Sequence, residues 1–258
     1  MNKIIRLSIL LFFFILTSRG QAPRPEFYQL KTYLLDSETQ ESRTDHYLSK
    51  SYLPALKRQG ITNIGVFKPR SIDSLNPRSI QVLIPLTSIS QLETLEDELL
   101  RDRMYMASGK DFLDAPHDSP PYYRVQSIIL RAFSDMPKMR PSSLKGPRKD
   151  RVYELRSYES ATEAKYRNKV AMFNEGGEVV LFEELGFNAV FYAEVLSGAH
   201  MPNLMYMTTF KDMDSRDAYW QSFRDSPVWH KLKADPVYQN NVSKNDTRFL
   251  YPTDYSDY

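Results

Sequence analysis

The side chains best suited to chemistry lie on two similar strand-like segments, FYQLKTYL from residue 27 and RVYELRSYE from residue 151. Because side chains alternate along a strand, Lys31 and Tyr33 share one face of the first segment. Glu154, Arg156 and Tyr158 share the corresponding face of the second segment. If a barrel encloses these faces, the charges must pair or bind something, because an unpaired buried charge is costly. We therefore predict that these five residues bind a ligand. The alternative is that Glu154 and Arg156 pair with Lys31 or with other neighbours and fix the barrel register.

Two of the histidines could act as a base. His46 falls on a predicted helix and His200 in a loop between two predicted strands, and imidazole changes its charge near neutral pH. We predict both as candidate catalytic residues, with Tyr33 or Tyr158 as the hydrogen-bond donor. The alternative for each histidine is an exposed or hydrogen-bonded side chain without a catalytic role.

A pair of glycines interrupts a long helical pattern in the second half. The pattern over residues 161–185 contains Gly176 and Gly177, each of which costs up to about 1 kcal/mol relative to alanine inside a helix. Either the pair allows a kink or a close approach to the sheet, or it exposes backbone amides to a ligand. For the second case we include the adjacent Asn174 and Glu178 among the predicted ligand-binding residues.

The usual motifs of several enzyme classes are missing from the sequence. There is no glycine-rich nucleotide-binding loop, no GxSxG nucleophile elbow and no HExxH zinc motif, and without cysteine there is no thiolate nucleophile or thiolate metal ligand. Asp114, His117 and Asp118 are close in sequence, but they fall in a proline-rich loop, and zinc usually needs three or four converging ligands. We expect neither a metal nor a cofactor.

The two strand-like segments each open a copy of one pattern of elements. Each copy reads strand, helix, strand, strand, helix, strand, and matching tyrosine and leucine positions recur at a constant offset. The sequence therefore predicts two tandem ferredoxin-like βαββαβ repeats over residues 21–134 and 151–258, joined by a proline-rich, basic linker over residues 135–150. In such a repeat the helices cover one face of the sheet. We expect them to cover the apolar faces and to leave bare the faces that carry the polar candidates.

The amino terminus is typical of a secretory signal peptide. Lys3 and Arg6 precede an apolar run over residues 7–16, and small residues stand before a cleavage site at Gln21. The apolar run has about half of the roughly 20 residues that a helix needs to span a bilayer, so we expect residues 1–20 to be removed. The mature protein is then periplasmic or secreted, with no membrane span.

The charge of the mature chain argues against nucleic acid as a partner. The net charge of +2 includes Lys3, Arg6 and Arg19 of the signal peptide, so the mature chain is almost neutral. Interspersed charges without a basic stripe give no reason to expect binding to nucleic acid or to anionic lipid.

Four motifs, ELRSYE, KVAMFNEGGE, PNLMYMTTF and WQSFRDSPVW, resemble the NIPSNAP family in the two-copy form found in exported bacterial proteins. The resemblance covers nearly all of the mature chain and is strongest over residues 151–229. It implies a dimeric α+β barrel, in which two ferredoxin-like sheets pair across their bare faces, and here two copies in one chain could supply both sheets. The wider superfamily includes cofactor-free monooxygenases and haem enzymes, but the resemblance supplies no catalytic motif for this chain.

Three functions remain open at the level of the sequence. The first is binding of a small, partly apolar molecule in a cavity of the barrel lined by tyrosine and methionine. The second is a cofactor-independent monooxygenase or isomerase, and the third is a non-catalytic protein-interaction module. An open pocket without histidine would favour the first function, and a pocket containing histidine the second. The partners that we expect are a small-molecule ligand and, as one option, a second copy of the chain in a homodimer.

Overall fold

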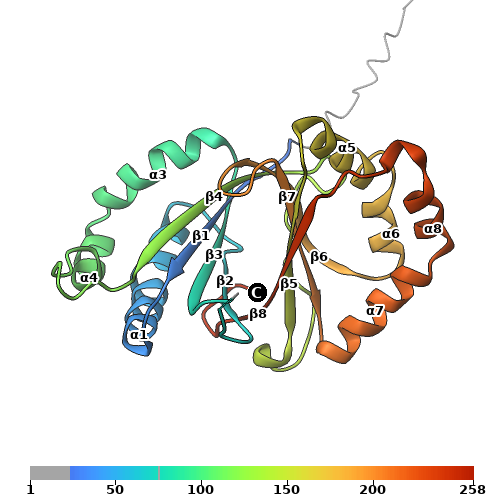
Figure 1. Cartoon of the computed structure of the whole chain (residues 1–258). Coiled ribbons are helices and arrows are strands. Elements are labelled where there is room, and N and C mark those ends of the chain that lie inside the picture. Colours follow the sequence, from blue (N-terminus) through green and yellow to red (C-terminus); the bar gives the residue numbers. More distant parts are fainter. Residues whose placement is uncertain (1–23, 75) are drawn as a thin grey trace, which may run out of the picture.

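The computed structural model describes residues 24–74 and 76–258, and a closed β-barrel forms its centre (Figure 1). Within these residues the strands pair in the order β1-β3-β2-β8-β5-β7-β6-β4, and every ladder is antiparallel. The strands are β1 (Phe27–Leu34), β2 (Gly65–Pro69), β3 (Ser79–Leu86), β4 (Arg124–Ala132), β5 (Val152–Glu159), β6 (Asn188–Ser197), β7 (Asn203–Phe210) and β8 (Lys244–Pro252). The predicted signal peptide and its cleavage site lie outside the described residues.

Helices stand on the outside of the barrel, those of the first half on one side and those of the second half on the other (Figure 1). The first half contains α1 (Glu38–Tyr47), the π-helical turn η1 (Leu48–Tyr52), α2 (Leu53–Arg58), α3 (Ile89–Arg101) and α4 (Arg103–Leu113). The second half contains α5 (Glu163–Phe173), α6 (Glu178–Glu184), α7 (Met213–Asp225) and α8 (Pro227–Ala234), and short 3-10 turns lie at Arg148–Asp150 and Pro236–Tyr238. The prediction of a mixed α+β fold built on a barrel is confirmed.

The barrel interior is filled by apolar side chains to which every strand contributes. Tyr28 and Leu30 of β1 and Tyr153 and Leu155 of β5 are all buried in this one cluster. Lys31 and the other polar candidates lie on the opposite face of their strands, toward the helices. The prediction that helices cover the apolar faces is therefore wrong. A closed barrel excludes water and so needs the apolar faces inside, whereas the outer faces can hold polar side chains in ion pairs and in the clefts under the helices.

The last residues of the chain add to the barrel interior. Tyr258 is buried, and its ring centroid lies 5.8 Å from that of Phe67 and 6.2 Å from that of Tyr153. Asp257 forms an ion pair with Lys57 and accepts a hydrogen bond of 2.9 Å from the backbone N–H of Ile64. The interior is therefore filled by side chains rather than left open for a ligand.

The glycine pair breaks the helix predicted over residues 161–185 into α5 and α6. Gly177 has a φ of +79°, a left-handed conformation that favours glycine. A Cβ atom on Gly176 would lie 2.5 Å from the backbone oxygen of Met172, closer than atoms can approach. Both glycines are thus explained by the turn itself, as in the kink interpretation.

An ion-pair cluster joins α1 to the sheet. Lys68 Nζ lies 2.8 Å from Glu41 Oε1 and 2.6 Å from Asp45 Oδ2, and Arg78 pairs with the other oxygen of Glu41. Burial alone would raise the pKa of the Glu41 carboxyl, but the hydrogen bonds from Lys68 and Arg78 outweigh it and lower this pKa from its usual 4.5. The cluster therefore stabilises the fold most where Glu41 is ionised.

Glu41→Gln should lower the free energy of unfolding by about 1–2 kcal/mol near neutral pH, because it removes charge-assisted hydrogen bonds. A carboxyl with a depressed folded pKa contributes stability above its unfolded pKa, and this contribution is lost as the pH falls through the folded value. Urea denaturation at about pH 7 and about pH 3 should therefore show a smaller difference between mutant and wild type in acid. Glu38→Gln is the matched control, because Glu38 is 88% exposed and lies 3.6 Å from Arg78. An equal loss at both pH values would contradict the assignment.

Candidate functional site

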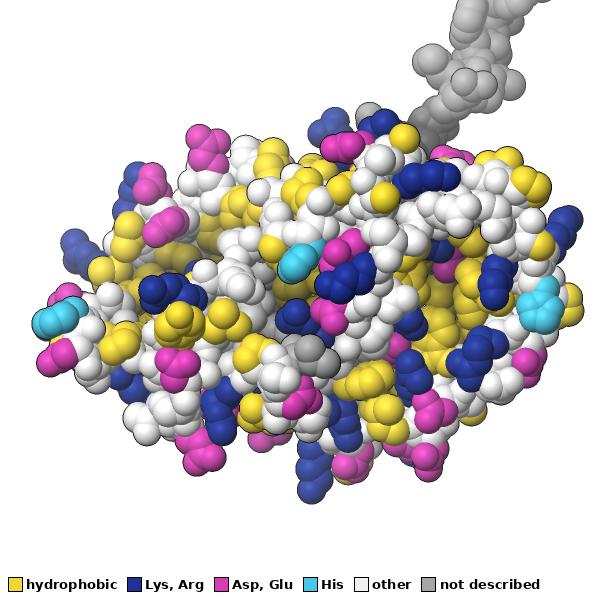
Figure 2. Space-filling view, in the orientation of Figure 1, with side chains coloured by type: hydrophobic (Ala, Val, Ile, Leu, Met, Phe, Trp, Pro, Cys, Tyr) yellow, Lys and Arg dark blue, Asp and Glu magenta, His cyan; other side chains and the backbone are white. Residues whose placement is uncertain are grey.

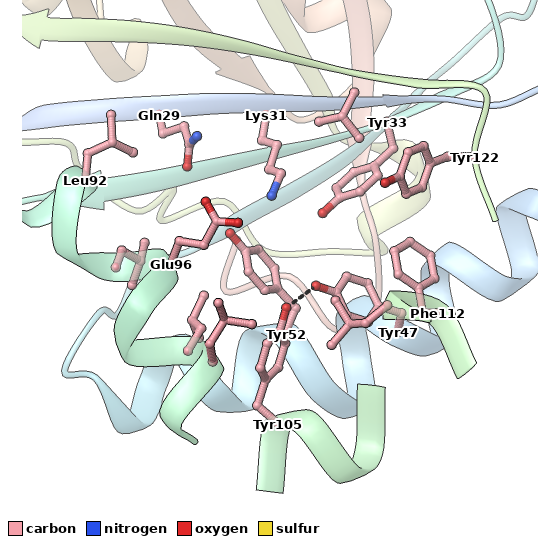
Figure 3. Close-up of a pocket in the computed structure, with 15 residues that line it drawn as sticks. Gln29, Lys31, Tyr33, Tyr47, Tyr52, Leu92, Glu96, Tyr105, Phe112 and Tyr122 are labelled. Atoms are coloured by element: carbon pink, nitrogen blue, oxygen red, sulfur yellow. Dashed lines mark hydrogen bonds between the residues drawn. The ribbon is translucent and has the colours of Figure 1, made fainter. Parts of the chain in front are cut away.

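An open cleft of about 340 Å³ separates the outer face of β1 from the helices of the first half. Figure 2 shows apolar side chains recessed below α3, and Figure 3 shows the residues that line the cleft. We call it the tyrosine cleft, and its walls include Lys31, Tyr33, Tyr47, Tyr52, Leu92, Glu96, Tyr105, Phe112 and Tyr122. This volume is in the range of sites for small organic molecules.

An irregular helix gathers the aromatic wall of the cleft. The π-helical turn η1 comes just before Pro54, which has no backbone N–H for a regular helical ladder. Tyr47 precedes this turn and Tyr52 is its last residue. Their ring centroids lie 5.7 Å apart and their ring planes meet at 19°. Phe112 of α4 stacks on Tyr47 at a centroid distance of 3.9 Å. The helices thus present a continuous aromatic surface to the sheet.

Lys31 extends from β1 into the cleft (Figure 3). Its Nζ atom lies 5.0 Å from the ring centroid of Tyr52 and 5.6 Å from that of Tyr33. Among the described residues no acceptor lies within hydrogen-bond or ion-pair distance of this ammonium. Burial lowers the pKa of Lys31 below its usual 10.5, and the charge of Glu96 on α3 counteracts this in part. An unpaired, partly desolvated ammonium is a favourable contact for an acidic or carbonyl oxygen of a ligand.

The phenols around Lys31 remain protonated at neutral pH. Burial is the largest cause that raises the pKa of Tyr33, Tyr47 and Tyr52 above the usual 10.0. The hydroxyl groups of Tyr47 and Tyr105 share a hydrogen bond of 2.7 Å. The cleft therefore offers O–H donors rather than phenolates to a bound molecule.

The five predicted strand residues do not form one cavity. Lys31 and Tyr33 line the tyrosine cleft, whereas Arg156 and Tyr158 line a separate cleft of the second half. Glu154 lies on the same face of β5 but is completely buried. The prediction that a barrel encloses all five is wrong, because both faces lie outside the barrel and on opposite sides of it.

Glu154 is held by the helix above it and not by Lys31. Arg216 of α7 donates to its two oxygens at 2.8 Å and 2.9 Å, and Trp220 Nε1 donates at 2.7 Å. Arg156 adds a longer bond of 3.3 Å. Glu154 therefore pairs with neighbours other than Lys31, and its main partners, Arg216 and Trp220, were not predicted.

The candidate histidines lie outside the tyrosine cleft. His46 is exposed on α1 and lines a separate groove between α1 and α4. His200 lies in the loop between β6 and β7, with a side chain 66% exposed and Nδ1 3.7 Å from a carboxylate oxygen of Glu159. Neither histidine is placed to act on a molecule bound beside Lys31.

Asn174 and Glu178 have partners within the protein. Asn174 Oδ1 accepts hydrogen bonds from Ser134 Oγ at 3.1 Å and from the backbone N–H of Asp135 at 3.3 Å, which tie α5 to the end of β4. Glu178 Oε2 lies 2.7 Å from Lys169 Nζ in a buried ion pair. Of the two, Glu178 lines the second cleft.

Apart from Glu178, the helical residues that line the two clefts were not predicted from the sequence. Tyr52, Tyr105 and Phe112 come from segments whose packing on the sheet depends on long-range contacts. Pro54 was the one local signal for part of this wall, because proline interrupts a regular helix. Tyr47 lies just before the irregular turn η1, and Tyr52 is its last residue.

Two further features of the described residues bear on function. They contain no group of three or more His, Asp or Glu side chains arranged to hold a metal ion. No helix among them combines the length and the apolar composition needed to cross a bilayer.

Residues 153–257 match the family model described as NIPSNAP. The predicted resemblance to the NIPSNAP family is confirmed over this domain. A NIPSNAP family protein from Agrobacterium tumefaciens strain C58 is 20% identical and aligns with 42% of this chain and 97% of its own, with a TM-score of 0.37. No curated protein matches the sequence.

Two other solved structures resemble the whole barrel, of which the NIPSNAP domain forms the second half. A candidate monooxygenase from Lactobacillus acidophilus NCFM is 8% identical, with a TM-score of 0.56 over 89% of this chain and 94% of its own. An anthrone oxidase-like protein is 10% identical, with a TM-score of 0.50 over 90% of this chain and 93% of its own. At such low identity the similarity shows the fold alone.

Proposed function

We propose that this protein binds a small, partly apolar molecule with an acidic or carbonyl oxygen in the tyrosine cleft. The observation that carries the proposal is the unpaired ammonium of Lys31 inside an open cleft ringed by tyrosines. The oxygen would contact Lys31, the phenols would donate further hydrogen bonds, and the aromatic walls would cover the apolar part. We propose a site outside the barrel because the barrel interior is filled by side chains.

Native mass spectrometry of protein purified from its own host should show a retained small molecule that mild denaturation releases.

A panel of aromatic carboxylates can then be tested for binding by ligand-observed NMR. Lys31→Met should weaken binding of the best acid by about tenfold or more, because one charge-assisted contact is lost. Lys50→Met is the matched control, since Lys50 is exposed on η1 and does not line the cleft. If Lys31→Met binds the acids as the wild type does, the proposal fails.

The same cleft supports a second candidate function, a cofactor-independent monooxygenase or isomerase. The lowered pKa of Lys31 gives it a larger fraction of neutral amine than a free lysine has, and the neutral amine is the form that takes a proton from a substrate. In this candidate Lys31 replaces the predicted histidine bases, with Tyr33 or Tyr52 as the hydrogen-bond donor. Oxygen uptake with anthrone as a probe, lost in Lys31→Met and kept in Lys50→Met, would support it over simple binding.

We also propose that the two halves are tandem ferredoxin-like repeats. In support, the strand order β4-β1-β3-β2 of the first half corresponds to β8-β5-β7-β6 of the second, and each half has helices at equivalent places. Since the halves close one barrel within a single chain, a homodimer would not be needed to complete it. Light scattering on the purified protein would measure whether two chains associate.

We propose that the protein is exported to the periplasm or the medium after cleavage before Gln21. The basic residues, the apolar run and the small residues at the amino terminus support this proposal. Expression of the full chain in its host should give an extracytoplasmic product whose intact mass corresponds to a chain beginning at Gln21. Recovery of the uncleaved chain in the cytoplasm would contradict it.

A further inference from the structure

A second cleft, of about 500 Å³, lies between the helices of the NIPSNAP domain and the outer face of β5. In Figure 2 apolar side chains are recessed on this side of the molecule, with basic side chains around them. We call it the arginine cleft, and its walls include Arg156, Tyr158, Trp220, Phe223, Trp229 and Lys233. It occupies the place in the second half that the tyrosine cleft occupies in the first.

Cationic side chains outnumber carboxylates along this cleft. Lys169 is neutralised by Glu178, and Arg216 by Glu154 and Asp217. Three more cations, Arg156, Arg224 and Lys233, also line the cleft. Lys233 is exposed on α8, and no carboxylate lies within ion-pair distance of it in the part of the chain that the structure describes. The cleft therefore has an excess of positive charge that the protein itself does not balance.

Arg156 is the cation at the base of the cleft, and most of its donors are unused. A guanidinium has five N–H donors, but Arg156 donates one bond, of 3.3 Å, to Glu154. Both oxygens of that carboxylate already accept shorter bonds from Arg216 or Trp220. Nε of Arg156 is buried without a partner among the described residues. Its guanidinium carbon lies over the ring of Trp220, 4.5 Å from the ring centroid, in a cation–π contact.

We propose that the arginine cleft binds a flat organic anion, with its carboxylate on Arg156 and its apolar body against the tryptophan rings. A carboxylate would use the guanidinium donors that lack partners, and Lys233 at the rim would add long-range attraction. The tyrosine cleft differs, because its single Lys31 faces the carboxylate of Glu96. We therefore expect the arginine cleft to favour an anion over a neutral molecule more strongly than the tyrosine cleft does.

Both tryptophans of the chain line the arginine cleft, so their indole N–H signals in ¹H–¹⁵N NMR spectra report on this site. We would titrate 2-naphthoate and, as a neutral molecule of similar shape, 2-naphthalenemethanol. The naphthoate should bind at least about tenfold more tightly, and the difference should shrink with added salt. Equal affinities would overturn the proposal. Oleate as a third probe separates the sources of the anion, since displacement of naphthoate by oleate would favour a lipid-derived acid over a soluble aromatic acid.

Arg156→Gln should weaken naphthoate binding by about tenfold and leave naphthalenemethanol unchanged. A second pair of variants does not depend on the buried network. Lys233→Met at the rim should weaken naphthoate about threefold, whereas Lys231→Met on the same helix, outside the cleft, should not. The proposal is overturned if Arg156→Gln and Lys233→Met both bind naphthoate as the wild type does. If Arg156→Gln does not fold, wild-type affinity in Lys233→Met is enough to overturn it. Lys31→Met should leave the indole titration intact, which separates this site from the tyrosine cleft.

Discussion

Lys31→Met should make the protein more stable while removing its proposed contact with an acidic ligand. The free energy of unfolding should rise by about 0.5–1 kcal/mol near neutral pH, the size of gain seen when a functional but unfavourable group is replaced. The reason is that Lys31 holds a charge in a partly desolvated position with no ion-pair partner, and methionine has a similar length without the charge. The cation–π contacts with Tyr33 and Tyr52 oppose this gain but do not reverse the lowered pKa.

The gain should depend on pH in a defined direction. The folded pKa of Lys31 lies below the usual 10.5, so between these two values the unfolded chain binds more protons, and wild-type stability from this residue rises with pH. The advantage of Lys31→Met should therefore be largest near neutral pH and should shrink toward about pH 10. Chemical denaturation across this range measures the effect, with Lys50→Met as a control that should follow the wild type. A mutant less stable than the wild type at neutral pH would show that Lys31 is a stabilising residue.

Glu154→Gln should have the opposite and larger effect, a loss of about 3–5 kcal/mol. Glu154 is completely buried and accepts hydrogen bonds from Arg216, Trp220 and Arg156. An amide would leave Arg156 without a counter-charge and Arg216 with Asp217 alone, and it would turn an NH₂ group toward one of the two guanidinium groups. Urea denaturation followed by far-UV circular dichroism measures the loss.

Two further variants separate the loss of the buried charge from a general disturbance of packing by the substitution. Glu159→Gln, at the end of the same strand, should cost less than about 1 kcal/mol, because the carboxylate contacts His200 and Lys244 only at 3.7 Å and 3.6 Å. Adding Arg216→Gln to Glu154→Gln should recover part of the stability, since it removes a guanidinium whose buried partner has lost its charge. A Glu154→Gln protein within about 1 kcal/mol of the wild type would rule out a central role for this network.

Strand alternation predicted correctly which residues share a face, but not which face is inside. Lys31 and Tyr33 lie together, as do Arg156 and Tyr158, because alternation is a local property of an extended chain. The direction of these faces depends on closure of the barrel through the β2–β8 and β4–β6 ladders. These pairings join distant parts of the chain, and the residue pattern of a single strand contains no information on them.

The candidate site was predictable only where its chemistry is carried by the strands. Glu154 and Arg156 could be singled out, but Arg216, the main partner of Glu154, is 62 residues away on a helix. His46 and His200 were predicted from residue type and from their expected places on a helix and in a loop, and the structure places both at exposed positions. Residue type indicates what a side chain can do, whereas packing decides what it can reach.

The strands that carry Lys31 and Arg156 are paired along nearly their whole length on both edges. β1 pairs with β3 and β4, and β5 pairs with β7 and β8, so each of the two strands is hydrogen-bonded along both edges and packed on its inner face. Their backbone amides should exchange with deuterium only through global unfolding, whereas the helices opposite them can open locally. Each cleft therefore combines a cationic side chain on a rigid strand with a wall of helices that can adjust to the size of the ligand. We therefore expect each cleft to be selective for the position of the ligand oxygen. We expect it to tolerate different shapes in the apolar part of the ligand.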